Sequence, residues 1–337
     1  MYGRCTAFLL LLFLVGCTVK EERQVQRSFY YWKTGFRLSP KEKTYLRDLS
    51  VKHLYIKLFD VSWDDERQAA LPVAKSLFRE APPKNIAITP VVFITNETLV
   101  KSDTAQVNVL AERIASLLSS ISTTASLQLS GEVQVDCDWT AGTKNKYFQL
   151  LEALRQTPFV QGKKLSATIR LHQLKYLSEN GVPPVDKGLL MAYNMGNLRH
   201  PETGNSIIEP SELKKYIRSM DNYPLPLDVA LPLFEWYVLF RQNSYKGLVH
   251  RLENDSLPWK NGRHVFMGDT VVGGYSFRRG DWLRHERSDA GEVKTCANLL
   301  AKKLKNREVN VILYHLDEYN LTKYQLYELE SFYNSFR

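Results

Sequence analysis

The sequence alternates between strand-like and helix-like segments, and this order limits the fold more than any other feature. Strand-like segments are short and rich in β-branched and aromatic residues, whereas apolar residues recur every three or four positions in helix-like segments. The predicted strands cover residues 28–36, 52–61, 85–95, 132–139, 165–172, 188–196, 227–236 and 309–316. The predicted helices cover residues 40–49, 66–79, 104–121, 144–156, 211–220, 292–305 and 322–335.

Eight strands separated mostly by helices predict an α/β protein with a parallel sheet. Each helix returns the chain to the end of the sheet at which the strands begin, so the next strand runs in the same direction. Eight such units close into a TIM barrel, so a single (β/α)8 domain is predicted for residues 28–337. An open doubly wound sheet is the alternative. It is disfavoured because no glycine-rich phosphate turn follows the first strand, where Lys33–Phe36 leads straight to a helix.

The longest connection covers residues 237–291, between the seventh and eighth strands. Long loops after barrel strands usually overhang the mouth of the barrel. This segment is therefore predicted to be an insertion, with a substrate-binding role and a purely structural role equally open.

The N-terminal segment has the pattern of an export signal. An uncharged apolar run over residues 7–15 is too short to span a bilayer. The run ends in Leu14-Val15-Gly16-Cys17, which resembles a bacterial lipobox.

Residues 1–17 are accordingly predicted to be a lipoprotein signal peptide, with Cys17 as the first mature residue and the site of lipidation. Acyl chains such as palmitate on Cys17, followed by a tether over residues 18–27, predict an exported protein held at the outer membrane or cell surface of a bacterium. An ordinary cleaved signal or an uncleaved helix is the alternative, because Arg4 is the only basic residue before the apolar run.

Two cysteines remain after such processing, Cys137 and Cys296. Both are predicted to be buried free thiols, although export also permits a disulfide between them. The seven histidines include no His-x-x-x-His pair, so neither a metal site nor a cofactor is predicted, and metal-dependent deacetylation is a remote alternative.

The net charge of +9 comes from 45 basic and 36 acidic residues that are spread along the chain. A distributed basic surface suits anionic glycans or lipid headgroups, and the sequence contains no nucleic-acid-binding motif. The predicted partners are therefore a glycan and a membrane, without nucleic acid, and the protein is predicted to be a monomer.

The fourth predicted strand carries two aspartates on one face. Side chains alternate along a strand, so Gln134, Asp136 and Asp138 share one face and apolar residues share the other. The apolar face packs against helices, which directs both aspartates into the barrel, with Asp138 nearest the C-terminal mouth. An unpaired buried carboxylate costs several kcal/mol, so these aspartates are either paired or functional.

Neighbouring strands supply partners on the same interior face. Alternation directs Lys57 of the second strand and Arg170 and His172 of the fifth strand inward. With Asp136 and Asp138 these side chains are predicted to form a charged network on the barrel axis. Such a network either builds an active site or only fixes the register of the strands.

The segment from Val133 to Thr140 resembles the fourth strand of family 18 glycoside hydrolases, the chitinase-like barrels. The family motif is Asp-x-x-Asp-x-Asp-x-Glu, often with Trp before the Glu. Asp136, Asp138 and Trp139 match this motif, whereas Val133 and Thr140 replace the first Asp and the catalytic Glu.

Three weaker matches lie on later strands. Met191-Ala192-Tyr193-Asn194 is similar to the family's Met-x-Tyr-Asp. Leu231–Phe234 resembles the seventh strand of the family, and Tyr314–Asp317 stands where the family has Trp-x-x-Asp.

The resemblance implies a glycoside hydrolase-like barrel that acts on or binds a polysaccharide. In the family the Glu protonates the leaving oxygen, and the last Asp steadies an acetamido nucleophile supplied by the substrate. The Tyr binds the same acetamido group. The resemblance thus implies catalytic roles for Asp136 and Asp138 and an acetamido contact for Tyr193.

The resemblance does not identify a proton donor, because Thr140 occupies the position of the catalytic Glu and its hydroxyl is far too weak an acid. Glu318 is the tentative replacement, with Glu235 and Asp60 as alternatives near other strand ends. Strict alternation along the seventh strand directs Glu235 outward unless the strand bulges.

Aromatic and polar side chains near the strand ends are predicted to bind the glycan, because aromatic faces stack on sugar rings. The predicted binding residues are Trp139, Tyr193, Asn194, Trp236, Tyr314, Lys57, Arg170 and His172.

Three functions are compatible with these patterns. A membrane-anchored glycosidase needs two carboxyl groups facing one cavity, roughly 5 to 10 Å apart. A catalytically inactive glycan-binding barrel needs the cavity without the second carboxyl group. A structural lipoprotein predicts that the interior charges pair completely and that the barrel has no open mouth.

Overall fold

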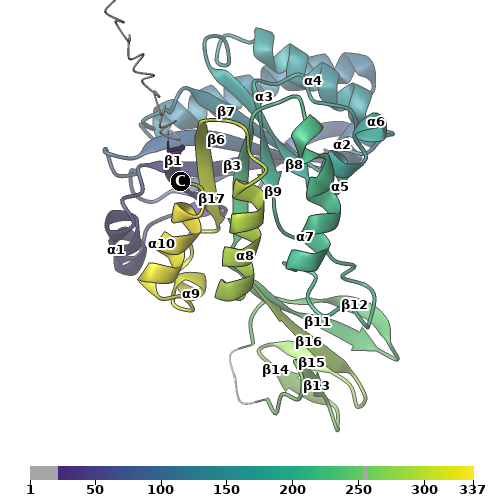
Figure 1. Cartoon of the computed structure of the whole chain (residues 1–337). Helices are drawn as coiled ribbons and strands as arrows, with labels where there is room; N and C mark the ends of the chain where they lie inside the picture. Colours follow the sequence, from purple (N-terminus) through teal and green to yellow (C-terminus); the bar gives the residue numbers. More distant parts are fainter. Residues whose placement is uncertain (1–21, 253–256) are drawn as a thin grey trace, which may run out of the picture.

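The computed structural model describes residues 22–252 and 257–337, and its centre is a closed barrel of eight parallel strands (Figure 1). β1 pairs with both β17 and β3, which closes the barrel, so the predicted TIM barrel is confirmed and the open sheet is wrong. The barrel strands are β1 (Gln24–Tyr31), β3 (His53–Asp64), β6 (Ala87–Ile94), β7 (Glu132–Cys137), β8 (Lys164–Arg170), β9 (Lys187–Met191), β10 (Leu227–Pro232) and β17 (Glu308–Tyr314).

Helices follow most of the barrel strands and cover the outside of the sheet (Figure 1). The helices are α1 (Pro40–Asp48), α2 (Asn96–Lys101), α3 (Thr104–Thr124), α4 (Lys144–Gln156), α5 (Leu171–Lys175), α6 (Leu177–Asn180), α7 (Pro210–Tyr216), the 3₁₀ helix η1 (Ile217–Asn222), α8 (Ala290–Ala301), α9 (Glu318–Leu321) and α10 (Leu326–Asn334). Ser39 and Asp103 cap α1 and α3 through capping boxes with Glu42 and Gln106, which explains why both helices begin close to the predicted positions. None of the described helices is long and apolar enough to cross a membrane.

The predicted helix over residues 66–79 is wrong. The second barrel strand instead turns back as a hairpin, in which β4 (Ala69–Val73) runs antiparallel to the end of β3. The chain then forms β5 (Leu77–Phe78), which pairs with β2 (Gly35–Phe36). Pro72 explains the difference, because proline breaks a helix interior but is tolerated in an edge strand such as β4.

The connection after β10 is an antiparallel lobe that projects from the barrel (Figure 1). It begins at Glu235, before the predicted insertion 237–291, because β10 ends at Pro232 and a new strand follows. Buried side chains around Tyr237 and Phe240 give the lobe its own small cores. The lobe strands are β11 (Glu235–Arg241), β12 (Ser244–Val249), β13 (Arg263–Val265), β14 (Thr270–Val272), β15 (Tyr275–Phe277) and β16 (Trp282–Arg287).

The first described residues are fastened to the base of the barrel. The Arg23 guanidinium donates to the backbone carbonyls of Ala301, Leu304, Asn306 and Phe336 at 2.9 to 3.3 Å. The predicted tether over residues 18–27 is too long, because β1 begins at Gln24 and pairs with β17 from that residue. Cys17 and the predicted signal peptide lie outside the described residues.

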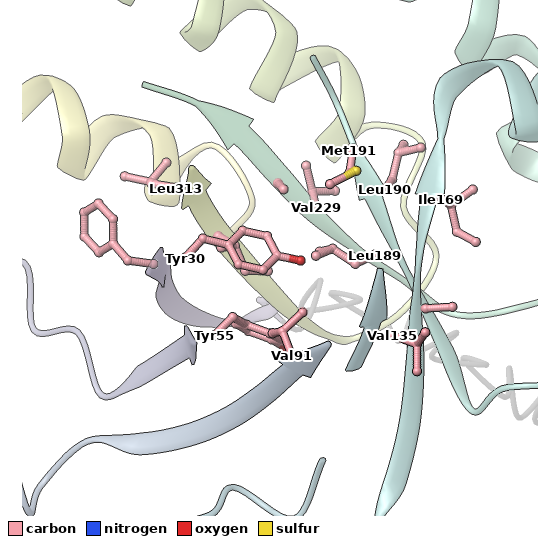
Figure 2. Packing of buried hydrophobic residues seen from close by; sticks show 14 of the residues in the cluster. Tyr30, Tyr55, Val91, Val135, Ile169, Leu189, Leu190, Met191, Val229 and Leu313 are labelled. Atoms are coloured by element: carbon pink, nitrogen blue, oxygen red, sulfur yellow. The ribbon is translucent and has the colours of Figure 1, made fainter. Parts of the chain in front are cut away.

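Polar side chains occupy much of the barrel interior, as alternation predicts for β3 and β7. Tyr30 donates to the Gln134 side chain, and Asn310 donates to the Tyr55 hydroxyl at 2.8 Å. Figure 2 shows Tyr30 and Tyr55 among the buried apolar residues of the strands. On the outward face of β7, Cys137 is a buried free thiol, as is Cys296 of α8.

Near the base of the barrel, one lysine holds two buried carboxylates together. Lys187 Nζ lies 2.7 Å from Glu132 and 2.6 Å from Asp228. Asp228 also accepts a hydrogen bond from the backbone of Asn310, which joins β10 to β17. The strands are therefore tied together by charge pairing as well as by their backbone ladder.

Replacing Lys187 by Met will lower the free energy of unfolding by about 3–5 kcal/mol, because two buried carboxylates lose their shared cation. Urea unfolding followed by circular dichroism measures this change. Lys164→Met is the matched control, since Lys164 is exposed at the same end of the barrel, and it is expected to stay within about 0.5 kcal/mol of the wild type. Equal stabilities of the two variants would contradict the structural role of Lys187.

Candidate functional site

A cavity of about 440 Å³ opens at the C-terminal ends of the barrel strands; we call it the mouth cavity. Barrel enzymes carry their active sites at this end. Its aromatic lining consists of Trp32, Phe93, Tyr193, Phe234, Trp236, Tyr314 and Tyr319. Its carboxylates are Asp60, Asp136, Asp138 and Glu235. Aromatic walls with a few convergent polar groups are typical of a binding site for a small molecule or a chain segment.

The mouth cavity carries a bidentate ion pair at its rim. Arg170 is the last residue of β8, and Asp138 directly follows β7. Arg170 Nε and Nη2 each donate to one carboxylate oxygen of Asp138, the second at 2.9 Å. The Asp138 side chain is still 48% exposed, so the pair is fixed in position and open to a ligand.

Asp136 lies one layer deeper and is almost completely buried. Thr168 Oγ1 donates to its carboxylate at 2.6 Å. Burial raises the pKa of Asp136 to about 6, and the negative charge of Asp138 acts in the same direction, while Arg170 and Thr168 oppose the shift. Asp136 therefore gains a proton at mildly acidic pH.

The predicted charged network is only partly correct. Lys57 pairs with Asp60 at 2.8 Å within β3, and its ammonium lies 5.4 Å from the centre of the Trp32 ring. This pair is separate from the Arg170–Asp138 pair. His172 is not part of the site: β8 ends at Arg170, so His172 is an exposed residue of α5.

Glu235 lines the mouth cavity, contrary to the outward direction that alternation along the seventh strand predicts. The reason is that Glu235 is the first residue of β11 and does not continue β10. It accepts hydrogen bonds from His285 at 3.2 Å, from the Tyr319 hydroxyl at 2.8 Å and from Lys323. Burial alone would raise the pKa of Glu235, but these donors hold it at about 2, so Glu235 stays ionised.

Tyr193 stands at the centre of the aromatic lining. Its ring centroid lies 5.3 Å from that of Tyr314 and 5.8 Å from that of Phe234, which in turn lies 5.2 Å from the Trp236 ring. Tyr193 is only 3% exposed, and its hydroxyl has no hydrogen-bond partner within the described parts of the chain. An unpaired buried hydroxyl is costly, so the Tyr193 hydroxyl is available to donate to a molecule that enters the cavity.

Several predicted site residues lie in the mouth cavity and others do not. Asn194, Trp236 and Tyr314 line it together with the residues described above. Trp139 is fully buried on the outer face of the barrel, where it stacks on Tyr147 at 4.9 Å and donates to the Asn180 carbonyl at 3.1 Å. The same alternation that directs Asp138 inward directs Trp139 outward, so its predicted contact with the glycan is wrong.

Of the three candidate proton donors, Asp60 and Glu235 line the mouth cavity, whereas the tentative donor Glu318 does not. Glu318 is an exposed residue at the start of α9 and does not line the mouth cavity. Thr140 likewise lies outside the lining, where its hydroxyl faces that of Thr143 at 3.3 Å.

Sequence reasoning missed several residues of the lining. His250 and Arg251 reach the mouth cavity from the lobe, and Tyr319 and Asn320 reach it from α9. Only the excess length of the 237–291 connection hinted at the lobe residues. No group of three His, Cys, Asp or Glu side chains in residues 22–252 and 257–337 is arranged to hold a metal ion.

Asp136→Asn will remove one component of the pH dependence of stability. The folded state binds the Asp136 proton more tightly than the unfolded chain, whose aspartate pKa is near 4, so wild-type stability falls as pH rises from about 4 to about 6. The difference in free energy of unfolding between variant and wild type should grow by about 3 kcal/mol across this window. Urea unfolding at several pH values measures it, and parallel curves would contradict the raised pKa.

Comparison with solved structures finds the same barrel in a chitinase and in a spore cortex-lytic enzyme. The GH18 chitinase of Cycas revoluta in complex with (GlcNAc)4 has a TM-score of 0.54 at 13% identity, over 93% of this chain and 100% of that chain. The spore cortex-lytic enzyme SleL of Bacillus cereus has a TM-score of 0.52 at 11% identity, over 94% of this chain and 75% of that chain. No family model and no curated protein matches the sequence. The chain therefore has the fold of the chitinase-like glycoside hydrolase barrels.

Proposed function

We propose that the protein is a membrane-anchored barrel whose mouth cavity binds a segment of an N-acetylglucosamine polymer without cleaving it. The observation that carries this proposal is the Tyr193 hydroxyl, which is buried, lines the cavity and has no partner among the described residues. Such a hydroxyl can donate to the carbonyl oxygen of an acetamido group. The rings of Phe234, Trp236 and Tyr314 offer surfaces on which pyranose rings stack.

The similar barrels support this class of ligand. The chitinase of Cycas revoluta has been solved with (GlcNAc)4 and with (GlcNAc)3. At the rim of the present cavity, the fixed Arg170–Asp138 pair offers both a donor and an acceptor to sugar hydroxyl groups.

The pairing of the carboxyl groups in the mouth cavity supports binding without cleavage. Glu235 is held ionised by three donors, and Asp60 and Asp138 are each paired with a cation. The position that carries the acid in the family is occupied by Thr140, outside the cavity. Losing a positioned general acid typically costs 10²–10⁴-fold in rate.

Hydrolysis is the second candidate, and one observation favours it. Asp136 lines the mouth cavity and has a pKa of about 6, so a protonated carboxyl group is present at mildly acidic pH. Its depth below the rim favours a structural role, because an acid must reach the glycosidic oxygen.

The membrane anchor is a separate part of the proposal and depends on Cys17. The lipobox-like sequence before it supports export and acylation. A glycan-binding barrel on an acyl anchor would hold a polymer close to a bacterial membrane.

Tyr193→Phe will weaken binding of N-acetylglucosamine oligosaccharides roughly 2- to 12-fold, because one buried hydrogen bond contributes about 0.5–1.5 kcal/mol. Isothermal titration calorimetry measures the affinity. Tyr223→Phe is the matched control, since it also removes a buried hydroxyl without a described partner, but outside the mouth cavity. Equal affinities of both variants would contradict the proposed contact.

The same oligosaccharides, analysed by mass spectrometry after incubation at pH 5 and pH 7, are expected to remain intact. Shorter products that disappear with Asp136→Asn would replace binding by hydrolysis as the function.

Cys17→Ser will abolish incorporation of labelled palmitate and move the protein from the membrane fraction to the soluble fraction of a bacterial host, because the acylated thiol is lost. Cys296→Ser is the control, since Cys296 is a buried thiol of the barrel. Retention of Cys17→Ser in the membrane fraction would exclude the lipid anchor.

A further inference from the structure

The end of the barrel opposite the mouth carries a short segment that is dense in positive charge. Residues 302–307, which join α8 to β17, read Lys-Lys-Leu-Lys-Asn-Arg and contain no acidic residue. Because β17 is one of the parallel barrel strands, the segment directly before it lies at the N-terminal end of the barrel. Lys302, Lys305 and Arg307 are exposed there.

The start of β1 adds a further cation to this segment. The Arg23 guanidinium is held by three backbone carbonyls within residues 301–306. We call the following group the basic collar: Arg23, Lys302, Lys303, Lys305 and Arg307. Three acidic residues lie next to it along the chain or in space, namely Glu22, Glu308 and Asp221, which pairs with Lys303. Five cations against three carboxylates leave the collar with a net charge of +2.

A cleft of about 280 Å³ opens beside the basic collar; we call it the basal cleft. Met220, Leu225 and Leu227 give it an apolar lining, and Lys303 and Lys305 belong to the same lining. Lysines beside apolar surface are typical of the interface between a protein and a bilayer, where the aliphatic stems lie on apolar groups and the ammonium groups meet phosphates.

The basal cleft also contains a buried donor. Tyr223 lines the cleft and is only 8% exposed, and its hydroxyl has no hydrogen-bond partner in the described ranges of the chain. A buried hydroxyl in this state is costly. An oxygen of a phosphate diester that enters the cleft between the lysines would accept the missing hydrogen bond.

We infer that the basic collar docks on a bilayer that contains anionic phospholipids, with one headgroup phosphate in the basal cleft. This inference rests on the anchoring part of the proposed function, because acyl chains on Cys17 would bring Arg23 close to the bilayer. Acyl chains and a polybasic patch together hold a protein at a membrane more firmly than either signal alone. The collar is thus a second attachment point, which restricts how the barrel swings on its N-terminal segment.

The experiment uses the full chain with Cys17→Ser, which carries no acyl anchor. Cosedimentation at low ionic strength measures its affinity for vesicles of phosphatidylcholine alone and for vesicles that also contain phosphatidylglycerol. The apolar residues 7–15 meet the same hydrocarbon in both vesicles, so the ratio of the two affinities reports the effect of headgroup charge. This ratio is expected to be roughly 25, because each unpaired cation near an anionic surface contributes about fivefold.

Adding Lys302→Gln and Lys305→Gln removes two exposed cations of the collar and is expected to abolish most of this preference. The matched control is Lys41→Gln with Lys246→Gln, which removes the same charge from exposed positions of α1 and β12 and should keep the ratio. Circular dichroism verifies that both variants are folded. Tyr223→Phe should weaken binding to the anionic vesicles roughly 2- to 12-fold, the effect of one hydrogen bond.

A ratio near one for the chain with Cys17→Ser, or an equal loss in both double variants, would overturn docking of the collar. Unchanged binding by Tyr223→Phe would overturn the placement of a phosphate in the basal cleft. Neither result depends on palmitate incorporation at Cys17, so the anchor of the proposed function is tested separately.

Discussion

The pairing of charged and polar side chains inside the barrel is the constraint on which the rest of the structure depends. A closed barrel directs every second side chain of each strand to its axis. Here the interior carries the buried residues Glu132, Gln134 and Asp136, and the partly buried Lys187 that pairs with Glu132. Buried charge is tolerated only with a partner, so Lys187 between two carboxylates ties β7, β9 and β10 into one register. The same register delivers Asp136 and Asp138 to the mouth.

The alternation of side chains along the strands predicted the fold and those site residues that lie on the barrel strands. The strand count and the inward positions of Lys57, Asp136 and Arg170 follow from a period of two, although β3 departs from this period directly after Lys57, where its register with β6 shifts. The errors lie where strands end: Arg170 closes β8, so His172 belongs to a helix, and Pro232 closes β10, so Glu235 starts a new strand. The position of Trp139 was predictable, because it shares the outer face with Cys137.

The strands of the lobe could not be predicted from the sequence for a different physical reason. They are short, and the lobe cores are small clusters, such as Phe240 stacked on Trp282, that leave no periodic pattern in the sequence. Glu235 shows the consequence. Its partners come from β16, from α9 and from the segment after α9, so its ionised state depends on contacts between distant parts of the chain. Two carboxyl groups of one cavity thus have pKa values on opposite sides of the ordinary range, Asp136 at about 6 and Glu235 at about 2.

The hydrogen bonds of Arg23 hold the start of β1 at the end of the barrel opposite the mouth cavity. All barrel strands run the same way, so the mouth lies at the opposite end from the carbonyl groups that hold Arg23. Five residues lie between Cys17 and Arg23, and that stretch spans at most roughly 20 Å. With the proposed anchor, the N-terminal end of the barrel would lie close to the bilayer, and the mouth cavity would face away from it. A polymer bound in the mouth cavity would then be held at a distance from the bilayer set by the height of the barrel.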